Sequence, residues 1–94
     1  MQILWTDEAL TDFEEILTYY YQEVSPRTAA AVEQRIITDI ESLPPFPERI
    51  RASHRIPGAR ELVVSKLPYI VLLQIKDDKL IILNIVHTKK KFPA

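Results

Sequence analysis

Apolar residues recur at three- and four-residue steps in two segments of the N-terminal half. The first stripe, from about Asp7 to Glu23, consists of Ala9, Leu10, Phe13, Ile16, Leu17, Tyr20 and Val24. The second consists of Ala29, Val32, Ile36, Ile40 and Leu43. This spacing predicts two amphipathic helices. Thr6 and Ser25-Pro26 are typical helix starts, and the short connection predicts an antiparallel helical hairpin.

The remaining apolar segments are short and predict strands. One precedes the helices, at Gln2–Trp5, and three follow a long proline-containing segment, at Arg60–Val64, Tyr69–Lys76 and Lys79–Thr88. Asp77-Asp78 separates the last two as a tight turn. We therefore expect one α+β domain over residues 1–94, in the order β-α-α-β-β-β. Its helical hairpin would pack on a mostly antiparallel four-stranded sheet.

The Asp77-Asp78 turn also predicts which side chains share a face of the sheet. If Lys76 faces Lys79, the more apolar face contains Tyr69, Val71, Leu73, Ile75, Leu80, Ile82, Asn84 and Val86. We expect the helices to cover this face, with Leu62, Ile82 and Ile36 in the core. The opposite face contains Ile70, Leu72, Ile81, Leu83, Ile85 and His87. Either the segment Pro44–Ala59 covers its apolar residues or they bind a partner.

Charge is divided unequally along the chain. Residues 1–47 carry nine acidic and two basic side chains, whereas residues 48–94 carry four acidic and ten basic ones, for a total of −1. The Pro44–Ala59 segment is long for a loop and contains Arg49, Arg51, His54 and Arg55. This asymmetry favours an acidic or polyanionic partner, although a solvated acidic helix pair beside ordinary surface lysines gives the same pattern.

Composition excludes several classes of protein. Without cysteine the chain has no disulfide, and two histidines far apart in sequence do not indicate a metal site. The single glycine, Gly58, rules out a glycine-rich phosphate loop, so we expect no cofactor. No apolar segment approaches the ~20 residues of a membrane span, and the N-terminus does not resemble a signal peptide. We expect a cytoplasmic protein that does not bind membranes.

The basic half contains one candidate catalytic group. His87 ends the last strand beside Lys89, Lys90 and Lys91, and we expect Arg60 and Lys66 near the same end of the sheet. Cations that hold phosphate, together with a histidine for proton transfer, are typical of metal-independent nucleic-acid cleavage. The same residues also fit a simple binding contact. Glu61 should face away from Arg60 and neutralise a cation of a neighbouring strand or the tail.

Several segments together resemble the RelE/ParE superfamily of toxins from bacterial type II toxin–antitoxin modules. They are the start Trp5–Leu10, the helix pair, the segment Pro57–Val64, the strand at Tyr69–Leu72 and the closing segment Val86–Pro93. The resemblance covers essentially the whole chain. It implies a small growth inhibitor that is neutralised by a cognate antitoxin, and the complex would contact operator DNA only through the antitoxin.

Members of this superfamily differ in their target. RelE-like toxins are ribosome-dependent mRNA endoribonucleases, whereas ParE-like toxins inhibit DNA gyrase. Nuclease members usually have an arginine early in the strand at Tyr69–Val71 and a catalytic tyrosine near the C-terminus, and this chain has neither. The resemblance therefore favours gyrase inhibition over the alternative of ribosome and mRNA as target. A non-toxic protein-binding module is a third interpretation.

The resemblance and the charge pattern together predict three groups of site residues. For binding the target, we expect Arg51, Arg55, Arg60, His87, Lys89, Lys90 and Lys91. If the chain is a nuclease, the catalytic groups would be Arg60, Lys66, His87 and Lys90. An antitoxin segment would pack on or beside Ile70, Leu72, Leu83 and Ile85.

Overall fold

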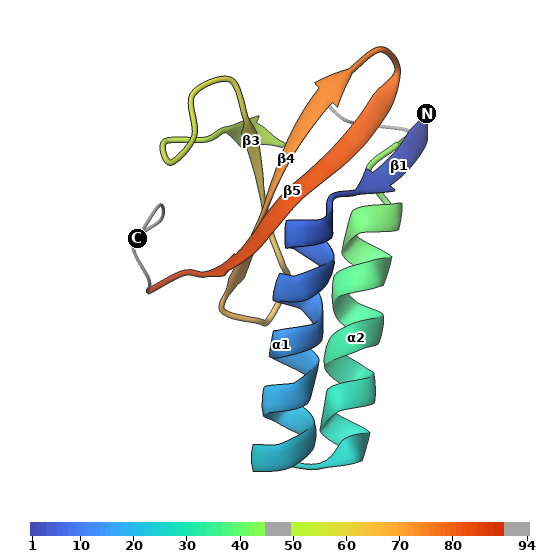
Figure 1. Ribbon diagram of the computed structural model, residues 1–94, viewed down its shortest axis with the longest axis vertical. Helices are drawn as coiled ribbons and strands as arrows, with labels where there is room; N and C mark the ends of the chain where they lie inside the picture. The colour runs from blue at the N-terminus through green and yellow to red at the C-terminus, as the bar shows by residue number, and fades with distance from the viewer. Residues whose placement is uncertain (45–49, 90–94) are drawn as a thin grey trace.

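The computed structural model describes residues 1–44 and 50–89 as two helices packed on one face of a twisted sheet (Figure 1). Helix α1 spans Asp7–Glu23 and helix α2 spans Pro26–Glu41. The strands are β1 (Gln2–Trp5), β2 (Arg51–Ala52), β3 (Arg60–Val63), β4 (Tyr69–Lys76) and β5 (Lys79–His87). The predicted α+β class and helical hairpin are confirmed. Within these residues, neither helix is long and apolar enough to cross a membrane.

The sheet has five strands rather than the four expected, in the order β1-β5-β4-β3-β2. β1 is parallel to β5, and the other neighbouring strands are antiparallel. The additional strand β2 pairs Arg51 with Glu61 and Ala52 with Arg60. A two-residue strand has no alternating pattern of its own, so the sequence gives no signal for it.

Both helices begin at the predicted residues. The Thr6 hydroxyl accepts a hydrogen bond from the Ala9 N–H at 3.1 Å, and the Ser25 hydroxyl accepts one from the Thr28 N–H at 3.0 Å. These side chains satisfy backbone donors that have no partner inside the helix, and each such cap typically contributes about 1 kcal/mol. Pro26 then occupies the first turn of α2, where its missing N–H costs nothing.

The hairpin of β4 and β5 has the predicted tight turn but contains a bulge. Asp77 and Asp78 adopt φ of 51° and 61°, as a two-residue turn of this kind requires, and Lys76 faces Lys79. The register then shifts, because Leu73 pairs with Ile82 whereas Leu72 pairs with Asn84. Leu83 is thus one extra residue in β5, the arrangement that defines a β-bulge.

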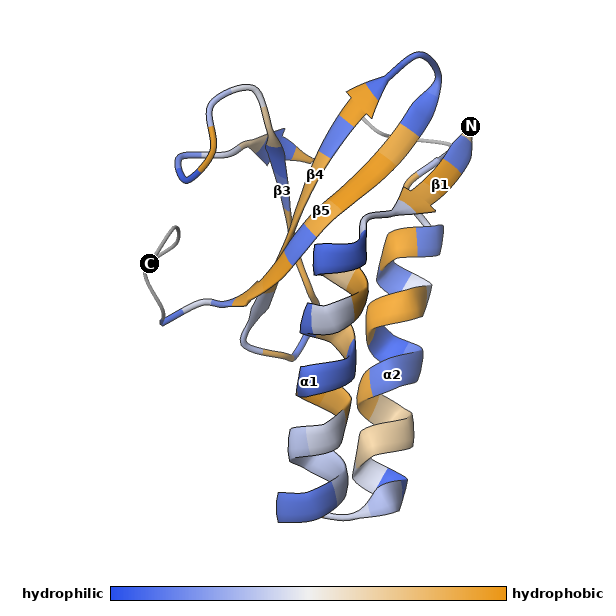
Figure 2. Cartoon of the chain, in the orientation of Figure 1, coloured by the Kyte–Doolittle hydropathy of each residue, from blue (hydrophilic) through white to orange (hydrophobic). Residues whose placement is uncertain are grey.

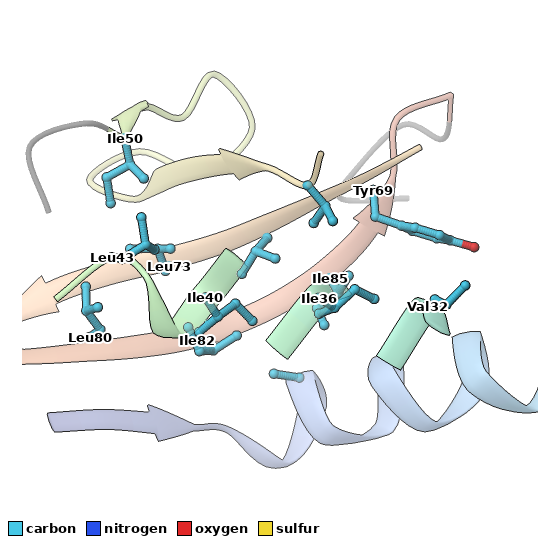
Figure 3. Close-up of a cluster of buried hydrophobic side chains, with 13 residues drawn as sticks. Val32, Ile36, Ile40, Leu43, Ile50, Tyr69, Leu73, Leu80, Ile82 and Ile85 are labelled. Carbon is cyan, nitrogen blue, oxygen red and sulfur yellow. The ribbon is translucent and has the colours of Figure 1, made fainter. Parts of the chain in front are cut away.

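This bulge corrects the predicted faces of the sheet. After Leu83, alternate side chains of β5 change sides, so Ile85 pairs with Val71 and His87 pairs with Tyr69. Ile85 therefore belongs to the helix-covered core, where Figure 3 shows it near Ile36, and not to the opposite face as expected. The two-residue period of a strand makes any single insertion exchange every later position.

Residues at the N-terminal end of α1 provide hydrogen-bond partners for the backbone groups of β5 around the bulge. The Thr6 N–H donates to the Ile82 carbonyl and the Thr6 hydroxyl to the Leu83 carbonyl, each at 3.0 Å. The Asp12 carboxylate accepts from the Ile85 N–H at 2.9 Å and from the Asn84 amide at 3.2 Å. Thr6 and Asp12 therefore take the place of a neighbouring strand where β1 ends.

The core lies between the helices and one face of the sheet. Orange, hydrophobic positions in Figure 2 line the inner sides of both helices and the central strands. Ile36 and Ile82 are fully buried, as predicted. Leu62 is only partly buried but packs against this cluster. The core also includes Val32, Ile40, Leu43, Ile50, Tyr69, Val71, Leu73, Leu80 and Ile85.

The buried carboxylate of Glu61 in β3 binds side chains of the segment after α2, on the face of the sheet away from the helices. The Glu61 side chain has no exposed surface; it accepts hydrogen bonds from Arg55 at 2.7 Å, Ser53 at 3.0 Å and Arg51 at 3.2 Å. Burial alone raises the pKa of the Glu61 carboxyl, but the hydrogen bonds from Arg55, Ser53 and Arg51 and the Arg55 charge outweigh it and lower that pKa below its ordinary value. The prediction that Glu61 neutralises a neighbouring cation is confirmed.

Shortening a side chain to alanine should destabilise the fold more when that side chain is buried than when it is exposed. We expect Ile36→Ala and Ile82→Ala each to lower the free energy of unfolding by ~2–5 kcal/mol, since each leaves a cavity in a packed core. Ile75→Ala is the matched control, because Ile75 is 37% exposed. Its loss should stay below about 1 kcal/mol. Urea denaturation measures all three, and equal losses would contradict this core.

The Glu61 cluster should make stability depend on pH. The folded state lowers the pKa of Glu61, so the carboxylate stabilises the fold above its unfolded pKa of about 4.3. This contribution is lost as pH falls through the lowered folded value. We expect Glu61→Gln to cost about 1–3 kcal/mol at neutral pH, with the difference from the unchanged protein shrinking in acid.

Urea denaturation across this pH range tests the prediction, with Glu41→Gln as control because Glu41 is exposed on α2. A deficit of the Glu61→Gln variant that stayed the same at every pH would show that the charge of Glu61 does not stabilise the fold.

Candidate functional site

Lys66, His87 and Lys89 lie at one end of the sheet. The Val64 N–H donates to the Tyr69 carbonyl, and Tyr69 pairs with His87, so the turn between β3 and β4 lies beside the end of β5. The Thr88 N–H donates to the Pro68 carbonyl at 2.9 Å and holds the two segments together. Lys66 and Lys89 are exposed there. We call Lys66, His87 and Lys89 the basic end.

His87 is held in one orientation by two contacts. Its ring meets the Tyr69 ring edge to face, with centroids 5.5 Å apart and planes at 84°. Its Nδ1 accepts a hydrogen bond from the Lys89 N–H at 3.1 Å. Because Nδ1 is the acceptor, a neutral ring carries its proton on Nε2.

This tautomer limits the chemistry that His87 can perform. A general base needs an unprotonated nitrogen in reach of the proton it removes. Here Nδ1 is occupied by the backbone and Nε2–H is a donor. His87 is therefore arranged to donate a hydrogen bond to an acceptor such as a carbonyl, carboxylate or phosphate oxygen, rather than to accept a proton.

Tyrosines connect this end of the sheet to α1. Tyr20 approaches Tyr69 with centroids 6.5 Å apart, and Tyr19 packs edge to face on Tyr20 at 5.2 Å. Burial, reinforced by Tyr20 and Tyr19, raises the pKa of the Tyr69 phenol above its ordinary value. Tyr69 therefore stays neutral, and its role here is to support the His87 ring. The sequence analysis missed the contact between Tyr69 and His87, because their pairing depends on the bulge at Leu83.

Arg60 does not join His87, contrary to the prediction. Arg60 pairs with Leu73, which pairs with Ile82, and His87 lies five residues further along β5. At a rise of about 3.3 Å per residue, the two positions are more than about 13 Å apart along the strand direction. β3 runs parallel to β5, so the start of one strand cannot meet the end of the other. The Arg60 guanidinium instead donates to the Ile50 carbonyl at 3.3 Å.

The residues predicted to bind a target therefore occupy two places. Arg51 and Arg55 pair with Glu61, and only the Arg51 side chain keeps a large exposed fraction, 62% against 24% for Arg55. His87 and Lys89 belong to the basic end. Lys90 and Lys91 lie outside the described residues. Of the predicted nuclease set, the structure brings together Lys66 and His87, but not Arg60.

The residues predicted to bind an antitoxin are less accessible than expected. Ile70 and Leu72 are buried, Leu83 is partly exposed at the bulge, and Ile85 lies in the helix-covered core. The premise of a large uncovered apolar face is therefore wrong for three of these four residues. Their contact with an antitoxin stays a prediction.

Over residues 1–44 and 50–89, no group of three carboxylate or imidazole side chains could hold a metal ion. Every buried polar side-chain atom in these ranges has a hydrogen-bond partner. At the basic end, Lys66 and Lys89 are exposed, and cations of this kind can form charge-assisted hydrogen bonds to acceptor oxygens.

Sequence relatives share nearly the full length of the chain. The family described as the ParE toxin of the type II toxin–antitoxin system parDE matches residues 3–92. Y4kP of Sinorhizobium fredii is 36% identical over 92 residues, which cover 98% of this chain and 93% of that protein. Toxin RelE2 of Caulobacter vibrioides is 35% identical over 89 residues, covering 95% and 97%.

Solved structures repeat the same architecture. The chromosomal ParDE toxin–antitoxin system of P. aeruginosa contains a chain with a TM-score of 0.86 and 25% identity, covering 95% of this chain and 97% of that one. The E. coli RelBE complex matches with a TM-score of 0.65, 10% identity and coverage of 95% and 98%, a likeness of fold alone. This protein belongs to the ParE toxin family of type II toxin–antitoxin systems, within the RelE/ParE superfamily.

Proposed function

We propose that this chain arrests growth by inhibiting DNA gyrase, and that a cognate antitoxin neutralises it by direct binding in the cytoplasm. Family membership supports the toxin role. The observation that carries the choice of target is the hydrogen bond from the Lys89 N–H to Nδ1 of His87. It leaves the only histidine of the basic end as a donor, which suits binding rather than proton abstraction.

Two further observations favour binding over RNA cleavage. The cations of the predicted nuclease set are divided, because Arg60 lies far along the sheet from His87. Transition-state stabilisation requires charges held in fixed positions about the reacting atoms. In addition, the match to the P. aeruginosa ParDE system has the higher TM-score and sequence identity of the two solved structures described above.

mRNA cleavage at the ribosome is the second candidate function. The observation in its favour is that Lys66, His87 and Lys89 gather at one accessible end, where they could contact phosphate oxygens. The name of the relative RelE2 agrees with it. In this alternative, His87 would have to exchange its bond with the Lys89 N–H for a bond with substrate before it could take a proton.

The proposed function also requires an antitoxin that binds this chain. Solved relatives include toxin–antitoxin complexes, among them ParDE and RelBE. We infer a cognate antitoxin protein as the direct partner of this chain, with contact to operator DNA through the antitoxin only. Salt-dependent association would follow if acidic antitoxin residues meet exposed cations such as Arg51.

Reversing charge at the basic end should weaken the toxin. We expect the double variant Lys66→Glu with Lys89→Glu to raise the concentration that inhibits purified gyrase by about tenfold or more, because both exposed cations of the basic end would then repel an acidic partner. Lys76→Glu with Lys79→Glu is the matched control, since both lysines are exposed at the distant turn of β4 and β5. The measurement is DNA supercoiling, beside mRNA integrity in cell-free translation.

The same assays test the proposed target. Inhibited supercoiling with intact mRNA supports gyrase as the target. Cleaved mRNA with unaffected supercoiling would move the function to the RelE-like alternative, and equal behaviour of the two double variants would refute a role for the basic end.

Substitutions of His87 separate a contact from a proton-transfer group. If His87 only donates a hydrogen bond, Gln retains a donor, so we expect His87→Gln to keep most of the inhibition and His87→Ala to lose more. Loss of a general base would instead cost ~10²–10⁴-fold in rate for both variants. Growth curves measure the difference, and circular dichroism confirms folding. A folded but inert His87→Gln variant would contradict the binding role.

A further inference from the structure

A carboxylate of α2 holds the turn between β3 and β4. The Asp39 Oδ2 atom accepts a hydrogen bond from the Ser65 N–H at 2.7 Å and another from the Ser65 hydroxyl at 3.0 Å. Hydrogen bonds to a carboxylate are shorter and stronger than those between neutral groups. Because Asp39 bonds the backbone of the turn as well as a side chain, it fixes the place of this turn against the helix.

Lys66, the next residue of this turn, has a left-handed backbone with φ of 64°. Glycine adopts this conformation freely and asparagine or aspartate tolerates it, but the Cβ atom of other residues meets backbone atoms. Within residues 1–44 and 50–89, the only other non-glycine residues with positive φ are Asp77 and Asp78 of the β4–β5 turn. Lys66 is therefore the one residue of an unsuited type in this conformation.

The neighbours of Lys66 hold it at the surface of the basic end. Val64 is buried and Leu67 packs against the core, whereas Lys66 between them is exposed. After the turn, the Pro68 carbonyl accepts a hydrogen bond from the Thr88 N–H at 2.9 Å. The turn is thus fixed at both ends, first to α2 and then to the segment that follows β5.

Asp39 also occupies a locally unfavourable position. The free carbonyl groups at the C-terminal end of a helix carry partial negative charge, so a carboxylate in the last turn is repelled. The last turn of α2 contains no basic residue that would offset this repulsion. Two residues that local preferences disfavour, Asp39 and Lys66, are thus connected through Ser65. Such departures from local preference are expected at functional sites, where they are retained for binding or catalysis.

We propose that Asp39 is a positioning residue, which holds the β3–β4 turn so that Lys66 contacts an acidic side chain of the target. A lysine ammonium forms charge-assisted hydrogen bonds with a carboxylate. Fixing the backbone that carries this lysine reduces the conformational entropy lost on binding. The proposal rests on the proposed function, in which the basic end binds DNA gyrase. Asp39 acts through Lys66 and does not touch the target.

A double-mutant cycle tests whether Asp39 acts through Lys66. We expect Lys66→Ala to raise the concentration that inhibits purified gyrase by about tenfold, and Asp39→Ala by about threefold. The double variant should match Lys66→Ala, because a positioning residue has no effect once the residue it positions is gone. Glu41→Ala is the matched control, since Glu41 is an exposed acid in the same turn of α2, and it should stay within about twofold.

Thermal denaturation of the same variants separates positioning from stability. We expect Asp39→Ala to lower the melting temperature equally with and without Lys66. If Asp39→Ala also weakened inhibition equally in both backgrounds, Asp39 would act on the fold alone and the proposal would be overturned.

Conservative substitutions test the two ends of the contact separately. Asp39→Asn keeps an acceptor oxygen for Ser65, so we expect it to retain most of the inhibition that Asp39→Ala loses. Protection of the Ser65 N–H from hydrogen exchange should follow the same order. A folded Asp39→Asn variant that protects this N–H but inhibits no better than Asp39→Ala would contradict the positioning role.

The backbone of Lys66 provides a further test, in which stability and inhibition should change in opposite directions. Asparagine tolerates the left-handed backbone, so we expect Lys66→Asn to raise the melting temperature by about 4 °C while weakening inhibition as Lys66→Ala does. Asp78→Gly is the control, because it relaxes the same conformation at the opposite end of the sheet and should leave inhibition unchanged. A Lys66→Asn variant that inhibits as well as the unchanged chain would overturn Lys66 as a contact.

Measuring mRNA cleavage beside supercoiling keeps this proposal separate from the proposed function. If the unchanged chain cleaves mRNA and leaves supercoiling unaffected, the proposed function fails, and the contact of Lys66 with an acidic side chain fails with it. The cycle of Asp39 and Lys66 measured on cleavage then decides the positioning role alone. Non-additive effects would support that role, and additive effects would overturn it.

Discussion

Hydrogen bonding along the outer edge of β5 is the constraint on which the arrangement of this molecule depends. Buried backbone groups without a partner are costly, and β1 supplies partners only as far as Ile82. Thr6 and Asp12 of the α1 region bond the next carbonyl and N–H groups directly. This fixes where α1 starts against the sheet and lets β5 contain an extra residue. The bulge then turns Ile85 toward the core and His87 toward Tyr69.

On the other face of the sheet, the buried carboxylate of Glu61 likewise needs hydrogen-bond partners. A carboxylate without exposed surface requires charged or hydrogen-bonding partners, and the segment after α2 supplies them from Arg51, Ser53 and Arg55. Two of the cations that give the second half of the chain its positive charge, Arg51 and Arg55, are thus paired with Glu61 within the protein's own fold. Among the described residues, Lys66 and Lys89 of the basic end are exposed and make no ion pair, a distinction that a count along the sequence does not show.

Local signals in the sequence were sufficient for the helices, their caps, the tight turn of Asp77 and Asp78, and most of the core. Each of these depends on residues within a few positions of one another. The bulge at Leu83 was not predictable, because no glycine marks it and its partners, Thr6 and Asp12, lie more than seventy residues away. The separation of Arg60 from His87 was missed because the direction of the strands was not considered. β3 and β5 run in the same direction, so the start of β3 and the end of β5 lie at opposite ends of the sheet.

The parallel pairing of β1 with β5 also determines when the molecule can fold. Gln2 pairs with Lys79 and Trp5 with Ile82, so the first strand to leave the ribosome has no partner until nearly the whole chain has been made. Contacts of such long range form late, after local hairpins. A chain that stops early lacks the strand against which α1 packs. For a toxin, this means that a nascent chain acquires its folded surface only after its own synthesis is almost finished.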